Sequence, residues 1–178
     1  MSQRKVWLAL RTPLTMLSLL AFVLIVGNWG LKQTLTPIPQ RPPEPCVVQT
    51  IGPTFTARNA TLRILNGTTT SGLAKNTKLI FGGAGFYVLK VGNAEAPAER
   101  TFISGVAPDS PEVVLVRSYF PADTPFVADA ERFRDHTVDI TLGKDFKTSM
   151  LSATPKTSVP TKDGTACIPN YKEINTGS

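Results

Sequence analysis

Residues 61–74, which read TLRILNGTTTSGLA, decide the fold class of this chain. Apolar Leu62 and Ile64 alternate with polar Arg63, which is typical of a short β-strand. The pair Asn66-Gly67 follows and predicts a turn, because both residues tolerate positive φ better than others do. The stretch therefore predicts a strand that ends in a tight turn.

A helix is expected directly after this turn, over residues 71–81. Ser71 is a residue type that caps helices by accepting backbone N–H bonds, and Leu73 begins the apolar face. The glycine-rich segment 82–85 ends the helix, since glycine readily takes the left-handed conformation that follows one. A strand, a turn and a helix in this order begin a compact α/β domain near residue 60.

The remaining elements are expected to be strands and one more helix. This helix is predicted to have Asp109 or Ser110 as its N-cap and Pro111 in its first turn. The Val-Val-Leu-Val run at 113–116 would also suit a buried strand, but the cap and the proline favour a helix. Further strands are expected over 86–91, 100–104, 124–128 (an edge strand) and 137–143. The predicted fold class is α/β: a small sheet of about four to five strands with two helices in β-α-β-β-α-β-β order, preceded by one transmembrane helix.

Residues 13–30 carry no charge and read PLTMLSLLAFVLIVGNWG. At about 1.5 Å per residue, a helix of this length is about 27 Å long, which suffices to cross a hydrocarbon core. Arg4, Lys5 and Arg11 precede it, so the positive-inside rule places the N-terminus in the cytoplasm. A cleaved signal peptide is the alternative, but residues 26–29 lack the small-residue pair typical of cleavage, which favours an uncleaved anchor. In both cases the rest of the chain is exported.

Proline dominates the segment after the anchor, with five prolines in residues 36–45. Such a run favours extended polyproline II and acts as a semi-rigid spacer. After Phe146 the chain becomes rich in Thr, Ser and Pro, and we expect a tail held only by Cys167. The predicted organisation is a cytoplasmic N-terminus (1–12), a transmembrane anchor (13–30), a Pro-rich linker (31–58), an α/β domain (59–147) and a C-terminal tail (148–178).

The two cysteines flank the domain, Cys46 before it and Cys167 after it. An even number of cysteines in an exported chain predicts a disulfide. The alternatives are weaker, because two distant cysteines and a single histidine make a poor metal set. Redox catalysis would favour a Cys-x-x-Cys spacing, which the chain lacks. No metal site is therefore expected.

The net charge of +6 has two sources. Three of the 19 Lys and Arg residues precede the apolar segment, and the others exceed the 13 Asp and Glu residues by only three. A surplus this small and dispersed argues against nucleic-acid binding.

Few residues carry chemistry. His136 is the single histidine, and no Gly-x-Ser-x-Gly elbow is present, so no catalytic residue is predicted. The turn after the first strand has the strand-to-helix polarity of a phosphate loop but lacks its lysine. Its residues are kept as a structural turn and a weak anion-site candidate: Asn66, Gly67, Thr68, Thr70 and Ser71. No cofactor is expected.

The order of these motifs resembles the LytR C-terminal domain family. The similarity rests on Leu-Asn-Gly-Thr with Ser-Gly-Leu-Ala, then Gly-Phe-x-Val, Val-Gly-Asn-Ala and Thr-Val-Asp-Ile-Thr-Leu-Gly-Lys-Asp-Phe, over residues 60–146. The anchor, the spacer and the flanking cysteines are most similar to the actinobacterial envelope-integrity proteins. The resemblance implies an accessory role in the cell envelope with no assigned catalytic residues.

Two functions follow from this resemblance. The first is a non-catalytic, membrane-anchored extracytoplasmic module that binds envelope or wall-assembly proteins, glycopolymer or peptidoglycan. The alternative is an accessory subunit or enzyme in the transfer of lipid-linked glycopolymers to peptidoglycan. The sequence leaves the partner, the binding face and the oligomeric state open.

Overall fold

The computed structural model describes residues 3–34 and 44–170. The chain divides into two units, Met1–Arg41 and Pro42–Ser178. In the first unit, α1 (Gln3–Thr34) contains the predicted anchor segment. Within the described part of the chain, no helix combines the length and apolar character that a membrane span requires. The predicted transmembrane anchor therefore stays a prediction.

The second unit is built on a five-stranded sheet. The domain elements are β3 (Thr61–Asn66), α2 (Leu73–Gly83), β4 (Tyr87–Asn93), β5 (Phe102–Gly105), α3 (Pro111–Arg117), β6 (Phe126–Ala128) and β7 (Val138–Leu142). The strand order is β4-β3-β7-β5-β6. β3 is parallel to β4 and β7, whereas β5 is antiparallel to β7 and parallel to the edge strand β6. The expected β-α-β-β-α-β-β order is confirmed.

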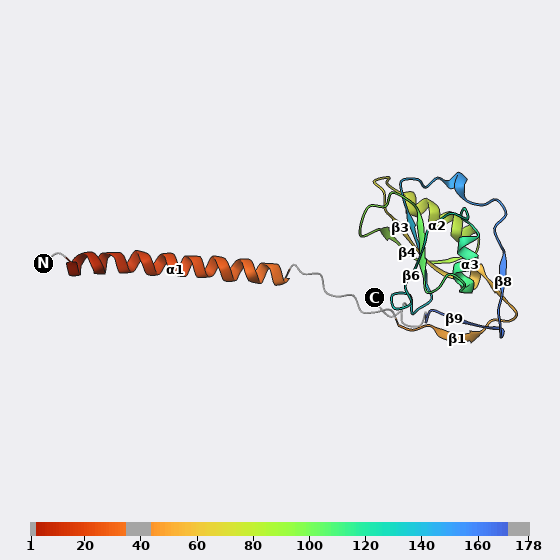
Figure 1. Cartoon of the computed structure of the whole chain (residues 1–178), viewed down its shortest axis with the longest axis horizontal. Coiled ribbons are helices and arrows are strands. Elements are labelled where there is room, and N and C mark those ends of the chain that lie inside the picture. Colours follow the sequence, from red (N-terminus) through yellow and green to blue (C-terminus); the bar gives the residue numbers. More distant parts are fainter. Residues whose placement is uncertain (1–2, 35–43, 171–178) are drawn as a thin grey trace. The chain divides into compact units, whose positions relative to one another are not determined.

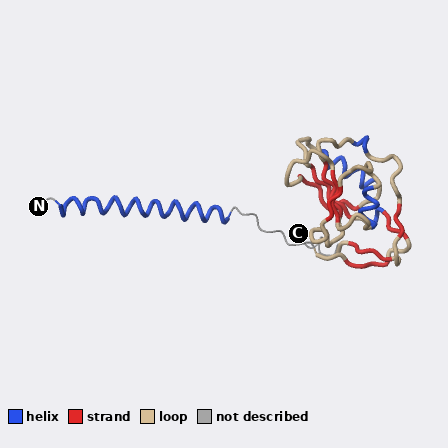
Figure 2. Tube along the Cα trace, in the orientation of Figure 1, coloured by secondary structure: helices blue, strands red, loops and turns tan. Residues whose placement is uncertain are grey.

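The main core lies between this sheet and its two helices. Helices α2 and α3 lie on the same side of the strands (Figure 1; strands red and helices blue in Figure 2). Leu62 and Ile64 of β3 are fully buried there, as the alternating pattern predicts. Phe81 of α2 stacks on Phe120 with ring centroids 5.9 Å apart and meets Phe86 edge-on at 5.5 Å. Each such aromatic pair adds about 0.5–1.5 kcal/mol beyond the area it buries.

The predicted N-cap of α2 is wrong by one residue. The helix begins at Leu73, and the cap position is held by Gly72 at φ 79°, so Ser71 lies outside the helix and makes no cap hydrogen bond. Only glycine takes this left-handed conformation freely. The glycine-rich end behaves as expected: the N–H of Gly85 (φ 94°) bonds to Gly82 and that of Phe86 to Phe81, the two bonds of a Schellman motif.

α3 settles the ambiguous Val-Val-Leu-Val run as a helix. Ser110 has an extended backbone at the cap position and Pro111 occupies the first turn, where its missing N–H costs no helical bond. Val113, Leu115 and Val116 are fully buried in the hydrophobic core. Because most residues of this short helix are buried, its sequence is as continuously apolar as that of a core strand. Periodicity alone therefore could not distinguish a helix from a strand.

The second face of the sheet is covered by the loop between β6 and β7. Its sequence is polar at most positions, but Phe133 within it is 1% exposed. Arg63 and Arg132 place their guanidinium carbons 5.4 and 5.7 Å from the centroid of the Phe133 ring. Oδ1 of Asp139 in β7 accepts a hydrogen bond from Arg63 Nε at 2.5 Å. Burial raises the pKa of Asp139 above its ordinary value, opposed by the charge of Arg63.

Two small antiparallel sheets join the segments on either side of the domain. β1 (Val47–Thr50) pairs with β9 (Thr165–Ile168), and β2 (Thr54–Thr56) pairs with β8 (Ser158–Pro160) (Figure 1). Short 3-10 turns lie at Ala57–Asn59 and Thr148–Met150. The expectation of a tail held only by its cysteine is therefore wrong. Residues 35–43, with most of the Pro-rich spacer, lie outside the described residues.

Candidate functional site

The pocket with the strongest claim to function lies where β3, β4 and β7 end. Carboxyl ends of parallel strands meet at one edge of a sheet, which is where open α/β sheets bind ligands. Here the last residues of β3 and β4, Asn66 and Asn93, are register partners. The cavity measures about 450 Å³. Its lining residues are Asn66, Gly67, Thr68, Thr69, Thr70, Ser71, Asn93, Ala94, Ala96, Pro97 and Lys144.

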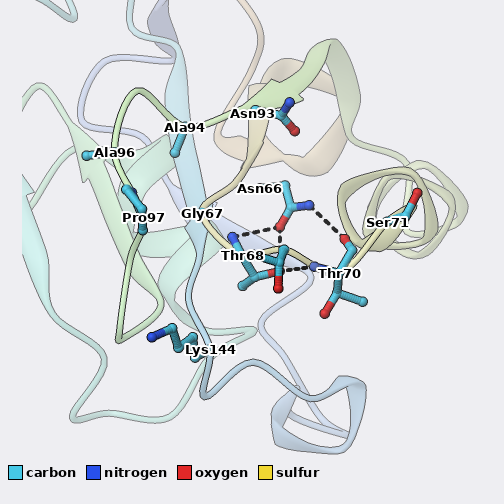
Figure 3. A pocket seen from close by; sticks show the side chains of 11 residues that line it. Asn66, Gly67, Thr68, Thr70, Ser71, Asn93, Ala94, Ala96, Pro97 and Lys144 are labelled. Carbon is cyan, nitrogen blue, oxygen red and sulfur yellow. Dashed lines mark hydrogen bonds between the residues drawn. The ribbon is translucent and has the colours of Figure 1, made fainter.

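The turn after β3 is held by its own side chains. Asn66 Oδ1 accepts bonds from the Thr68 N–H at 3.0 Å and the Thr68 hydroxyl at 2.8 Å. Asn66 Nδ2 donates to the Thr70 carbonyl at 2.8 Å, and Thr68 Oγ1 accepts from the Thr70 N–H at 3.0 Å (Figure 3). Asn and Thr side chains favour turns through such bonds to nearby backbone groups. The loop is thus a fixed wall of the pocket.

Gly67 is required at this turn for a reason other than the one predicted. Neither Asn66 nor Gly67 has a positive φ; the positive φ of this segment belongs to Gly72. Instead, a Cβ on Gly67 would lie 2.7 Å from Ala98 Cβ and 2.9 Å from the Leu142 carbonyl oxygen. The backbone of Gly67 bonds in both directions, to Leu142 at 2.9 Å and from Ala98 at 2.8 Å. Close approach of three backbone segments fixes the turn to the end of β7.

The chemistry of the pocket suits neutral polar groups. Its lining residues include hydroxyls and amides but no histidine, cysteine or carboxylate, so they contain no nucleophile-base pair and no acid-base pair. Lys144 is its one cationic lining residue, and its Nζ donates to Glu99 Oε1 at 2.6 Å. Two turn amides, of Thr68 and Thr70, already bond to side chains. The anion site proposed for this turn stays a prediction.

Sequence reasoning identified the turn but missed the rest of the pocket wall. Asn93 and the loop through Pro97 follow β4, and Lys144 follows β7. The signal that would have found them is an asparagine at the end of each of two parallel strands. Because α2 connects β3 to β4 and the two strands are parallel, Asn66 and Asn93 lie at the same edge of the sheet.

The other predicted site residues lie at the opposite end of the sheet. Cys46 and Cys167 form the expected disulfide, with Cα atoms 5.3 Å apart. His136, just before β7, has its Nδ1 2.7 Å from Glu112 Oε1. This bond raises the pKa of His136, more than burial of the ring lowers it. Glu112 was not singled out from the sequence, because nothing local marks a glutamate in the first turn of a helix as buried.

Comparisons with known proteins bear on this domain. Residues 59–146 match the family model of the LytR cell envelope-related transcriptional attenuator. No curated protein matches the chain. Among solved structures, the soluble domain of a conserved hypothetical secreted protein from Mycobacterium marinum is similar, with 20% identity and a TM-score of 0.44 over 59% of this chain and 71% of that one.

Proposed function

Because residues 59–146 belong to the LytR C-terminal domain family, we propose that this protein is a non-catalytic envelope module, held outside the cytoplasmic membrane by its N-terminal helix. In this proposal the module supports cell-envelope integrity or wall assembly by binding wall polymer. The family match is the observation that carries the proposal.

Two observations support an extracytoplasmic position. The Cys46–Cys167 disulfide is of the kind that persists in oxidising, exported environments. The uncharged segment 13–30 follows three basic residues, Arg4, Lys5 and Arg11, and has no acidic residue before it. This charge asymmetry orients a membrane helix with its N-terminus in the cytoplasm.

The polar pocket supports binding over catalysis. Its lining includes the hydroxyls of Thr69, Thr70 and Ser71 and the side-chain amide of Asn93. Such groups both donate and accept hydrogen bonds, as the hydroxyls of a saccharide require of a partner. The bonds among Asn66, Thr68 and Thr70 fix the turn on one side of the pocket, which reduces the ordering that binding requires.

The test is site-specific photo-crosslinking in cells that carry the full-length protein. A photoreactive residue replaces Thr69, which is exposed on the pocket wall, or, as the matched control, Lys162, which is exposed between β8 and β9. We expect Thr69 to capture saccharide-containing wall material and Lys162 to capture none.

Three outcomes are distinguishable in this experiment. Equal capture of wall material at both positions would contradict a specific pocket. Capture of envelope proteins alone at Thr69 would replace the polymer by a protein partner. Capture of neither at Thr69 would contradict the proposed binding role.

A further inference from the structure

Three side chains that could bind a metal lie together at the end of the sheet away from the pocket. The Sγ atoms of Cys46 and Cys167 and one ring nitrogen of His136 are all within 4.8 Å of one another. All three residues are partly exposed, so solutes have access to them. They come from three separate segments of the chain, and for that reason their spacing in the sequence gave no metal signature.

Backbone hydrogen bonds join these residues in addition to the S–S bond. Cys167 lies in β9, where it pairs with Val48 of β1, two residues after Cys46. The N–H of Cys46 also donates to the carbonyl of Arg134 at 3.0 Å, which ties it to the segment that carries His136. Because these backbone bonds do not involve the sulfur atoms, we expect both of them to stay near the imidazole after reduction.

His136 is positioned as metal-binding histidines are. Its Nδ1 is 2.7 Å from Oε1 of Glu112, whose side chain is 2% exposed. Histidine ligands usually give one ring nitrogen to a carboxylate in this way, which fixes the tautomer and orients the other nitrogen toward the metal. The bond leaves Nε2 as the nitrogen available to an ion. The backbone of His136 is itself held at φ 57°, an uncommon conformation for a residue other than glycine.

We propose that reduction of the Cys46–Cys167 disulfide converts this cluster into a Zn²⁺ site formed by Cys46, Cys167 and His136, with Glu112 orienting the imidazole. Two thiolates and one imidazole are ligands that zinc prefers, and a site with three protein ligands keeps a fourth position for water. The oxidised chain has no such site, because the sulfur atoms are bonded to each other.

A dithiol is the reductant in this reaction of the disulfide. The dithiol supplies two electrons and two protons, leaves as a disulfide, and the S–S bond of the chain becomes two thiols. When Zn²⁺ binds, both thiol protons pass to solvent as the two S–Zn bonds form, and neutral His136 adds the third ligand. Metal thereby replaces the disulfide as the link between the segments before and after the domain. This inference does not depend on the proposed function.

The test uses the full chain, purified in mild detergent, with and without prior reduction by a dithiol that is then removed without air. Co²⁺ serves as the probe, since tetrahedral thiolate-bound Co²⁺ absorbs visible light, and Zn²⁺ is then added to displace it. We expect the reduced chain to bind one equivalent of each metal and the oxidised chain to bind at least about 100-fold more weakly, because thiolate ligands are required.

Two variants separate this site from metal binding by any two thiols. Glu112→Gln keeps an oxygen near His136 but loses the charge, and we expect about 10–100-fold weaker binding in the reduced chain. His136→Asn removes the imidazole while suiting the positive φ at this position, and should weaken binding further. Circular dichroism of each reduced protein reports whether the domain is folded.

The proposal is overturned by any of three results. The first is that the reduced chain binds no Co²⁺. The second is that the reduced His136→Asn variant binds Co²⁺ as tightly as the reduced wild type does. The third is that reduction unfolds the domain and neither metal restores the circular dichroism of the oxidised chain.

Discussion

The two ends of the five-stranded sheet differ in how the sequence builds them. At the carboxyl end of β3, one continuous turn from Asn66 to Ser71 supplies half of a pocket and makes its own hydrogen bonds. At the opposite end, Cys46, Glu112, His136 and Cys167 meet from segments far apart along the chain. The first end depends on local turn chemistry, and the second exists only after the chain has folded around the sheet.

This difference assigns different tasks to the two ends. A turn whose polar groups hydrogen-bond to one another has a fixed surface. A ligand that binds there loses little free energy to ordering of the turn. A cluster assembled from distant segments joins those segments, so its integrity and that of the fold are coupled. The two ends should therefore respond differently to substitution.

Removing the disulfide should give the largest loss of stability. The bond links residues 121 positions apart, and closing so long a loop stabilises by about 4–5 kcal/mol in the chain-entropy model. Cys46→Ser with Cys167→Ser should lower the free energy of unfolding in urea by about this amount. A loss below about 1 kcal/mol would indicate that the β1–β9 pairing alone holds this end.

Gly67→Ala should destabilise the pocket end by about 1–3 kcal/mol, because the added methyl has no space between Ala98 and the Leu142 carbonyl. Gly92→Ala in β4 is the matched control, since its Cβ would meet no atom closer than 4.0 Å. Urea unfolding of both variants measures the difference. Equal losses would mean that close packing does not explain the glycine at 67.

Asn66→Ala should cost about 1 kcal/mol for the side-chain hydrogen bonds it removes from the turn. Its effect on ligand capture should be larger than its effect on stability, because the pocket wall loses its fixed form. Thr69→Ala is the control: this exposed residue forms part of the same wall, and we expect its stability to match the wild type. Amide hydrogen exchange of residues 67–71 reports the loosening directly.

The smallest effect is a pH dependence at the disulfide end. The bond to Glu112 raises the pKa of His136 in the folded chain above its unfolded value of about 6.5. Its contribution to stability is fully present below that unfolded pKa and is lost as the pH rises through the folded pKa. The unfolding free energy should therefore fall over this window in wild type, and less so in Glu112→Gln. An unchanged slope in the variant would contradict the role given to the pair.

Local sequence patterns predicted most strands and helices of the domain, but few of the contacts between segments that are far apart in the chain. Alternation in β3 and the proline in the first turn of α3 identified the elements correctly, since both depend on nearest neighbours. Ser71 was predicted as the cap from its residue type. Gly72 occupies the cap position instead, because the backbone there has a φ of 79°, which glycine adopts most readily. Phe133 lies among charged residues in the sequence and Glu112 is itself charged, so the burial of both follows only from tertiary contacts. The same holds for the β1–β9 and β2–β8 pairs.

The proposed binding face of this envelope module is the carboxyl edge of the sheet. Amide chemical shifts of the isotope-labelled full chain, recorded while solubilised wall-polymer fragments are added, test this claim most directly. We predict shifts that saturate and are confined to Asn66–Ser71, Asn93–Ala96 and Lys144, with His136 and Cys167 unchanged. Shifts confined to the disulfide end, or none at saturating polymer, would contradict the account.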